Sequence, residues 1–283
     1  MTKKSHTLAT LLLLLPGVGY VALLIAAVLV MTVLQSIGFF SFTQETTIGL
    51  QEWSQVLNRE TLDSFLYSAK IAFVSSFGAL LFAYPLSLYL RQSFIGKSYL
   101  TALIRVPLFV PALVAAFLIL NIVSYHGIVN EILVALRIIK EPLRLTHDEW
   151  GIGVVAIQIW KNLPFQTLIL TSVLASIQSD LESAAKNLGA NAFQVFRHIL
   201  FPLSIPGVLT GVILVFIGVF GDYSINTVAG PLYPPSLSIR MYFLSKNFGE
   251  WGQAACIAIV IMVSALAFAW LYSRLAKLVT GVT

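Results

Sequence analysis

Charged residues are scarce in this chain. Asp, Glu, Lys and Arg make up 10% of its 283 residues, whereas they make up about 25% of an average soluble domain. A water-soluble globule of this size needs more polar surface than these residues supply, so a soluble enzyme or a secreted domain is excluded. Hydrophobic residues account for 58% of the chain, and this composition is typical of a membrane protein.

Cysteine is nearly absent, and low-complexity sequence is absent altogether. The single cysteine, Cys256, lies in an apolar run, so it cannot form an intrachain disulfide or build a thiolate zinc site by itself. His126 and His147 fall in one connecting segment, where exposure to solvent is the simpler interpretation, so we expect no metal site. The basic residues form no stripe with interleaved aromatics, and we therefore expect no nucleic-acid partner.

Long uncharged segments are abundant instead. A helix of about 20 apolar residues crosses the ~30 Å hydrocarbon core of a bilayer, and it satisfies its own backbone there. The first segment is longer than the ~7–15 apolar residues of a signal peptide, so we expect it to remain as an anchor. We predict an all-α membrane protein with six transmembrane helices, at about residues 9–34, 64–90, 101–124, 151–176, 204–229 and 253–276.

Six spans place both termini on the same side of the membrane. The loops on that side carry more Lys and Arg than the opposite ones, which by the positive-inside rule makes that side cytoplasmic. Residues 91–100 and 177–203 are then cytoplasmic loops. Residues 37–62 and 126–149 lie outside, and apolar residues spaced by three or four in the second of these predict a short amphipathic helix.

The loop at 177–203, IQSDLESAAKNLGANAFQVFRHILFPL, carries strong helix signals. Ser179, followed three residues later by Glu182, has the capping-box pattern and predicts a helix that starts near Asp180. Gly189 suits the left-handed residue at which such a helix ends.

A second helix is predicted after this glycine. Asn191 and Gln194 repeat the start signal, and apolar residues then continue to Pro202. The pattern therefore indicates a helix, a glycine corner and a second helix. A segment that merely links two spans does not need this much structure, although an ordinary structured loop stays open as the simpler alternative.

The same loop resembles the signature of the permease subunits of binding-protein-dependent ABC importers. That signature is Glu-Ala-Ala, three residues, Gly, nine residues, Ile, any residue, Leu and Pro. The residues at these positions are Ser183, Ala184, Ala185, Gly189, Ile199, Phe201 and Pro202, with Phe201 in place of the family's Leu, and the neighbouring acid is Glu182. Ser183 stands where the family has Glu, and the acid sits one residue earlier. One helical residue is ~100° of rotation, so Glu182 is not expected to replace that contact.

The resemblance covers about residues 60–275. The segments WKNLPF, from Trp160, and FGDYSINTVAGP, from Phe220, are similar to the spermidine/putrescine subgroup. The resemblance implies a single transmembrane permease domain of the type I importer fold over residues 1–283, in a bacterial cytoplasmic (inner) membrane. It also implies that 177–203 is the ATPase-coupling loop.

The partners that the resemblance implies are a pair of cytoplasmic ATPase subunits, a second permease subunit of the same or a homologous kind, and an extracytoplasmic substrate-binding protein. The chain has no Walker A loop, so we expect it not to be an enzyme and to hold no cofactor, with ATP and Mg²⁺ bound by the ATPase. The implied solute is small and polar, polyamine-like or related.

Two polar sets at membrane depth are candidates for the translocation path. The first, in the fourth predicted span, consists of Gln158, Lys161, Asn162 and Gln166. The second, in the fifth, consists of Asp222, Tyr223 and Asn226. A charge near the bilayer centre costs about 2.5–3.5 kcal/mol, so each should face a cavity or a partner.

Structural roles for the same residues stay open. Lys161 and Asp222 either pair with each other or bond backbone groups freed near Pro164 and Gly221. Their charges also fit a different class of protein, a self-contained six-helix channel or secondary transporter. Nearby, Gly207 and Gly211 have the spacing that permits close helix packing.

Overall fold

The structure is a computed structural model that describes residues 15–40, 48–143 and 145–280, and all regular secondary structure in them is helical. Backbone contacts divide the chain into two compact units. Unit 1 consists of Met1–Thr61 and Arg240–Val260, and unit 2 consists of Leu62–Ile239 and Ile261–Thr283. Helices α4 (Arg59–Arg91), α13 (Leu237–Tyr242) and α14 (Trp251–Thr280) each contribute residues to both units.

Unit 1 contains the N-terminal helix α2 (Tyr20–Ser36), which follows a π-turn at Leu15–Gly19, and the short helix α3 (Gln51–Val56). Most side chains of α2 are exposed although they are apolar, as expected for a helix surrounded by lipid or by another chain. The predicted first span therefore forms a helix from Leu15 onward, and its residues 9–14 lie outside the described residues.

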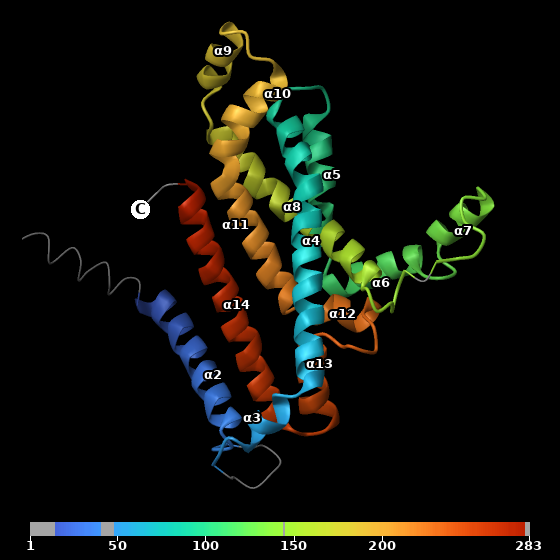
Figure 1. The fold of residues 1–283 in the computed structure, drawn as a ribbon, viewed down its shortest axis with the longest axis vertical. Helices are drawn as coiled ribbons and strands as arrows, with labels where there is room; N and C mark the ends of the chain where they lie inside the picture. The colour runs from blue at the N-terminus through green and yellow to red at the C-terminus, as the bar shows by residue number, and fades with distance from the viewer. Residues whose placement is uncertain (1–14, 41–47, 144, 281–283) are drawn as a thin grey trace, which may run out of the picture. The chain divides into compact units, whose positions relative to one another are not determined.

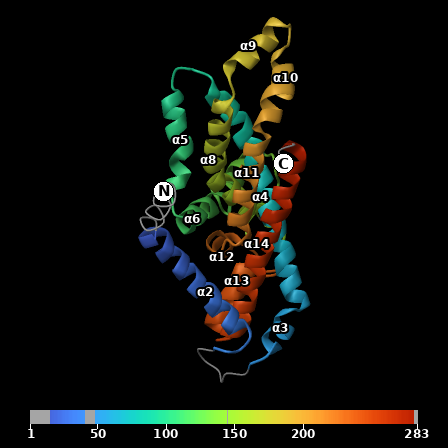
Figure 2. The same ribbon diagram turned by 90° about the vertical axis from the view of Figure 1, so that its left-hand side faces the viewer.

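Unit 2 holds most of the bundle (Figures 1 and 2). Its further helices are α5 (Lys97–Phe109), α6 (Ala112–Val123), α7 (Ile128–Ala135), α8 (Ile152–Ser176), α9 (Ser179–Asn187), α10 (Ala192–Val195), α11 (Phe201–Phe220) and α12 (Ser224–Ala229). Helices α8 and α11 lie side by side, and α9 and α10 lie beyond their ends (Figures 1 and 2). The predicted amphipathic helix is present as α7, although it ends at Ala135.

Glycines allow α8 and α11 to approach each other closely. A Cβ on Gly207 would lie 2.6 Å from Val173 Cγ2, and a Cβ on Gly211 would lie 3.2 Å from Gln166 Cγ. The spacing of these two glycines permits close packing, and in the structure both face α8.

Among the described residues, five helical segments are long and apolar enough to cross a membrane. They are Pro16–Ser36, Arg59–Arg91, Ala112–Ala135, Ala192–Phe220 and Trp251–Arg274. Helix α8 has 25 residues, but its polar residues keep it outside this set by composition. The count of six spans therefore stays a prediction.

The predicted third span, 101–124, is wrong as a single helix. It is broken between α5 and α6 at Val110, whose φ of −85° and ψ of 120° are extended, and Pro111 begins the next helix. A proline disfavours the helical conformation of the residue before it and donates no hydrogen bond to the preceding turn, so the helix ends there.

The predicted fifth span, 204–229, is wrong at both ends. Helix α11 stops at Phe220, and α12 is a separate short helix after Gly221. At the other end, the helix runs on from the loop, because Ala192–Phe220 is one helical segment and Pro202 does not interrupt it. A π-turn at Phe196–Leu200 precedes Pro202, and its wider backbone accommodates the proline ring.

Candidate functional site

Helix α9 and Gly189 form the first half of the loop at 177–203. Gly189 has a φ of +88°, so the predicted left-handed glycine corner is confirmed. No described atom lies within 4 Å of the position that a Cβ would take there, so the backbone conformation alone favours glycine. The predicted capping box is wrong: Gln178 occupies the N-cap without a side-chain bond, and Glu182 turns to Arg91 instead.

Helix α10 begins with a true capping box. Asn191 Oδ1 accepts a hydrogen bond from the Gln194 backbone N–H at 2.9 Å, and Gln194 Oε1 accepts one from the Asn191 N–H at 2.8 Å. This confirms the predicted second start. Each side chain satisfies a backbone donor that a helix start leaves without an intrahelical acceptor.

An apolar cluster attaches the base of the loop to the bundle. Its buried members are Leu174, Ile177, Val195 and Leu200, and the partly buried side chains packed against it are Leu88, Ala185, Ala190, Phe196 and Ile199. Two residues of the family signature, Ala185 and Ile199, thus face this cluster. Ser183, Ala184 and Pro202 are exposed.

A second attachment joins the start of α11 to α4. Tyr84 Oη and Ser204 Oγ lie 2.6 Å apart and share a hydrogen bond. The Tyr84 ring also meets the rings of Phe196 and Phe201 edge-on, with centroids 5.9 and 6.1 Å away. The loop is therefore mounted on the bundle through both of its helices.

The tip of the loop exposes large apolar side chains. Leu188 is 90% exposed and Phe193 is 65% exposed, on either side of Gly189. These two side chains are therefore available for contact with another protein at the loop tip.

Arg91, the last residue of α4, belongs to the site although the sequence did not single it out. Its Nη1 lies 2.6 Å from Glu182 Oε1, and its Nη2 donates to the carbonyl oxygen of Ile177 at 2.8 Å. The available signal was a basic residue at the end of one predicted span and an acid in the first turn of the loop helix.

Lys161 bonds backbone and not Asp222. Its ammonium group donates to the carbonyl oxygens of Pro107 and Val110, at the break between α5 and α6. These carbonyls lack helical donors because Val110 is extended and Pro111 has no N–H. The prediction that Lys161 bonds backbone groups near Pro164 is therefore wrong: the carbonyl groups that it bonds belong to the segment between α5 and α6.

Asp222 lies at the break between α11 and α12 and not inside a span. Its Oδ2 accepts hydrogen bonds from the backbone N–H groups of Ile225 at 2.9 Å and Asn226 at 3.3 Å. It therefore caps the start of α12, which agrees with the predicted bonding to backbone groups near Gly221. Tyr223 directly precedes that helix. Among the described residues, the ion pairs are Arg91–Glu182 and Arg240–Glu60, so Lys161 and Asp222 do not pair.

Several polar atoms of α8 and α12 are buried and have no hydrogen-bond partner among the described residues. They are both side-chain polar atoms of Gln166, Thr171 Oγ1 and Asn226 Oδ1. Asn162 donates to the backbone oxygen of Gln158 at 2.8 Å and to Gln158 Oε1 at 3.1 Å. The two polar sets meet at Gln158, whose side chain lies beside that of Asp222, whereas Lys161 faces the break at Val110 and Gln166 faces Gly211.

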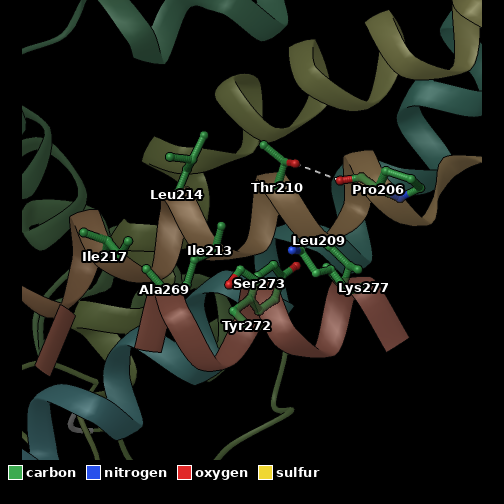
Figure 3. A pocket seen from close by; sticks show the side chains of 11 residues that line it. Pro206, Leu209, Thr210, Ile213, Leu214, Ile217, Ala269, Tyr272, Ser273 and Lys277 are labelled. Carbon is green, nitrogen blue, oxygen red and sulfur yellow. Dashed lines mark hydrogen bonds between the residues drawn. The ribbon is translucent and has the colours of Figure 1, made fainter. Parts of the chain in front are cut away.

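A groove of about 660 Å³ lies between α11 and α14, away from the predicted site residues (Figure 3). Leu209, Ile213 and Ile217 from α11 and Ala269 from α14 make most of its wall apolar. Thr210 Oγ1 donates back to the Pro206 carbonyl oxygen at 2.8 Å, so this hydroxyl is satisfied within its own helix. The groove carries no charge pattern that matches the polar sets of α8 and α12.

Long apolar helices, an ordered helix–glycine–helix loop and polar side chains at helix breaks are features of a multi-span membrane protein. Residues 75–281 match the family described as "Binding-protein-dependent transport system inner membrane component". The chain belongs to this family.

Named relatives agree with this assignment. The spermidine/putrescine permease PotB of Escherichia coli is 25% identical over 230 residues, which cover 80% of this chain and 83% of that protein. The trehalose/maltose permease MalF of Thermococcus litoralis is 28% identical, over 92% and 93%. The molybdenum permease ModB of Haemophilus influenzae is 28% identical, over 70% and 90%.

Solved structures share the fold. A bacterial ABC transporter that imports the acidic polysaccharide alginate superposes with a TM-score of 0.77 at 17% identity, over 98% of both chains. The MetNI methionine ABC transporter superposes with a TM-score of 0.62 at 14% identity, over 81% of this chain and 99% of that one. The fold is that of ABC transporter permeases.

Proposed function

We propose that this chain is the transmembrane subunit of an ABC importer, with residues 177–203 as its coupling loop to a cytoplasmic ATPase. The observation that carries the proposal is the exposure of Leu188 and Phe193 at the tip of an ordered, firmly attached loop. A loop mounted in this way passes movement of a docked partner to α8 and α11 as a rigid unit.

The test compares two leucines of equal exposure. Leu188 is 90% exposed at the loop tip, and Leu232 is 92% exposed between α12 and α13. Leu188→Ser is expected to reduce both the ATPase that co-purifies with the permease and the substrate-stimulated hydrolysis of ATP. Leu232→Ser is expected to change neither. An unchanged Leu188→Ser complex would contradict the proposal.

The complete importer that we propose has a pair of ATPase subunits, which bind ATP and Mg²⁺, a second permease subunit of the same or a homologous kind, and an extracytoplasmic binding protein. The family description supports the binding protein. A further structural neighbour, also an alginate transporter, is in complex with a periplasmic protein that holds an alginate pentasaccharide, with a TM-score of 0.71 at 16% identity, over 98% of this chain and 94% of that one.

In this arrangement both termini and the loop at 177–203 face the cytoplasm of a bacterial inner membrane. The orientation is tested with single cysteines in a Cys256→Ala background. Cysteines at Ser93 and Asn191 should resist an impermeant thiol reagent in intact cells, whereas one at Gln55 should react. Labelling of Asn191 from outside would reverse the orientation.

The translocation path that we propose runs past the polar residues of α8 and α12. It is supported by buried polar atoms of Gln166 and Asn226 without a partner among the described residues. Such atoms are costly unless water or a ligand bonds them.

The solute that we propose is small and polar, with the polyamine-like class first because spermidine/putrescine permeases are among the relatives. The relatives named for trehalose/maltose and molybdenum make a sugar or an oxyanion the competing outcomes. Mass spectrometry of the ligand that co-purifies with the cognate binding protein distinguishes the three.

The alternative function is a self-contained channel or secondary transporter. Reconstitution of the purified chain into vesicles without other subunits distinguishes this alternative from the importer. Solute uptake without an ATPase would support the alternative, and uptake only with the ATPase and ATP would support the importer.

A further inference from the structure

One arginine joins three segments at the base of the loop. Arg91 ends α4, its Nη2 donates to the carbonyl oxygen of Ile177 at 2.8 Å, and its Nη1 lies 2.6 Å from Glu182 Oε1. Ile177 is the C-cap residue of α8, and Glu182 is in the first turn of α9. A single planar guanidinium therefore connects the ends of α4 and α8 to the start of α9.

The ion pair is largely removed from water. The Arg91 side chain is 18% exposed and that of Glu182 is 22% exposed. Fully exposed pairs contribute little because water and salt screen them, whereas a desolvated pair with a second acceptor holds its geometry more firmly. Glu182 also lies in the first turn of α9, where the helix dipole attracts a negatively charged side chain.

Helix α9 has few other attachments. None of its nine residues, all of which the structure describes, is buried. Ala185 packs partly against the apolar cluster at the base. Beside the start of α9 lies a cavity of about 510 Å³, whose lining includes Arg91, Ile177 and Ser179. Without the guanidinium, the first turn of α9 is free to shift toward this space.

The position of the acid explains why it can reach Arg91. Ser183 occupies the first position of the family signature and is exposed, and its Oγ donates to the Ser179 carbonyl oxygen at 3.1 Å. Glu182, ~100° away around the helix, is turned toward the bundle. In this chain the carboxylate beside the signature is therefore bonded within its own subunit.

We propose that Arg91 is a positioning residue that locks α9 to the ends of α4 and α8, so that the loop and these helices move together. This inference rests on the proposed coupling function. It assigns Glu182 to an intramolecular pair and not to a contact with the ATPase.

The experiment uses the assembled importer and four variants: Arg91→Gln, Glu182→Gln, the charge swap Arg91→Glu with Glu182→Arg, and Glu60→Gln as the control. Glu60 belongs to the other ion pair among the described residues, with Arg240 at 2.8 Å, and is 62% exposed. The readouts are hydrogen exchange of the α9 amides by mass spectrometry, the yield of assembled complex, and the stimulation of ATP hydrolysis by loaded binding protein.

Arg91→Gln and Glu182→Gln are each expected to speed exchange in α9 and to lower the stimulation about tenfold, with assembly retained. The charge swap should recover part of both, because it restores the ion pair but a glutamate at position 91 cannot donate to the Ile177 carbonyl oxygen, and Glu60→Gln should change neither. Unchanged exchange and stimulation in both single variants would overturn the proposal. So would an effect of Glu182→Gln alone, which would place Glu182 against the ATPase, or a lack of recovery in the charge swap.

The result also separates this inference from the coupling function. If Leu188→Ser releases the ATPase while Arg91→Gln changes nothing, the positioning role fails and the coupling function stands. If Leu188→Ser changes nothing, the coupling function itself fails.

Discussion

The side chains of Asn191 and Gln194 each accept a hydrogen bond from the other's backbone N–H, at 2.9 and 2.8 Å, directly after the glycine corner. Because α10 has only four residues before the π-turn, this reciprocal cap decides where the helix of the loop begins. The direction in which the loop leaves Gly189 therefore depends on two polar side chains as much as on apolar packing.

Asn191→Ala removes one half of this cap. Loss of an N-cap side chain costs about 0.5–2 kcal/mol of helix stability, so hydrogen exchange at residues 193–195 should rise roughly tenfold. Asn191→Asp retains an acceptor and should leave exchange close to the parent rate. Equal exchange in the Ala variant and the parent would show that packing of Val195 alone holds this turn.

Gly189→Val introduces a β-branched side chain at a φ of +88°. No described atom lies within 4 Å of the Cβ position, so the cost comes from the backbone conformation and not from a clash. This strain is expected to be about 1–3 kcal/mol. Membrane insertion should survive, and substrate-stimulated hydrolysis of ATP should be lost. Gly189→Asn is the matched control, since Asn tolerates positive φ, and it should keep most of the stimulation. A fully active Gly189→Val variant would show that the loop is not the coupling element.

Lys161→Met leaves the carbonyl oxygens of Pro107 and Val110 without their donor, which should lower the stability of the complex by about 1–3 kcal/mol. Asp222→Asn should cost less, because Asn also caps a helix. Since the two residues bond separate backbone segments, the double variant should show the sum of both effects to within about 0.5 kcal/mol. Thermal stability and solute uptake are scored separately. Recovery in the double variant would instead indicate an ion pair.

Gly207→Ala tests the contact between α8 and α11. The new Cβ would lie 2.6 Å from Val173 Cγ2, so the helices must separate, at an expected cost of about 1–3 kcal/mol in the stability of the purified complex. Gly218→Ala on the same helix is the control, because no described atom lies within 4 Å of that Cβ position. It should be neutral or raise stability by up to about 1 kcal/mol. Equal melting temperatures for the two variants would argue against close packing at Gly207.

The sequence by itself determined the helical membrane class, the glycine corner at Gly189 and the helix start at Asn191. These depend on composition and on contacts within a few residues, such as a short polar side chain that reaches the backbone three residues ahead. The same local reasoning predicted a cap for Ser179 and Glu182, but the Glu182 carboxylate instead forms an ion pair with Arg91, which lies 91 positions earlier in the chain.

Tertiary structure alone decided where the half-buried charges of Lys161 and Asp222 bond. A polar residue in an apolar segment indicates that the side chain requires a hydrogen-bonding partner. The neighbouring sequence does not identify that partner. Lys161 donates to carbonyl oxygens more than fifty residues earlier in the chain, which lack helical donors because of the break at Pro111. Asp222 caps α12 because α11 ends at Phe220, two residues before it. Helix breaks in an apolar bundle create unpaired backbone groups, and the folded chain brings the charges to them because lipid offers no other partner.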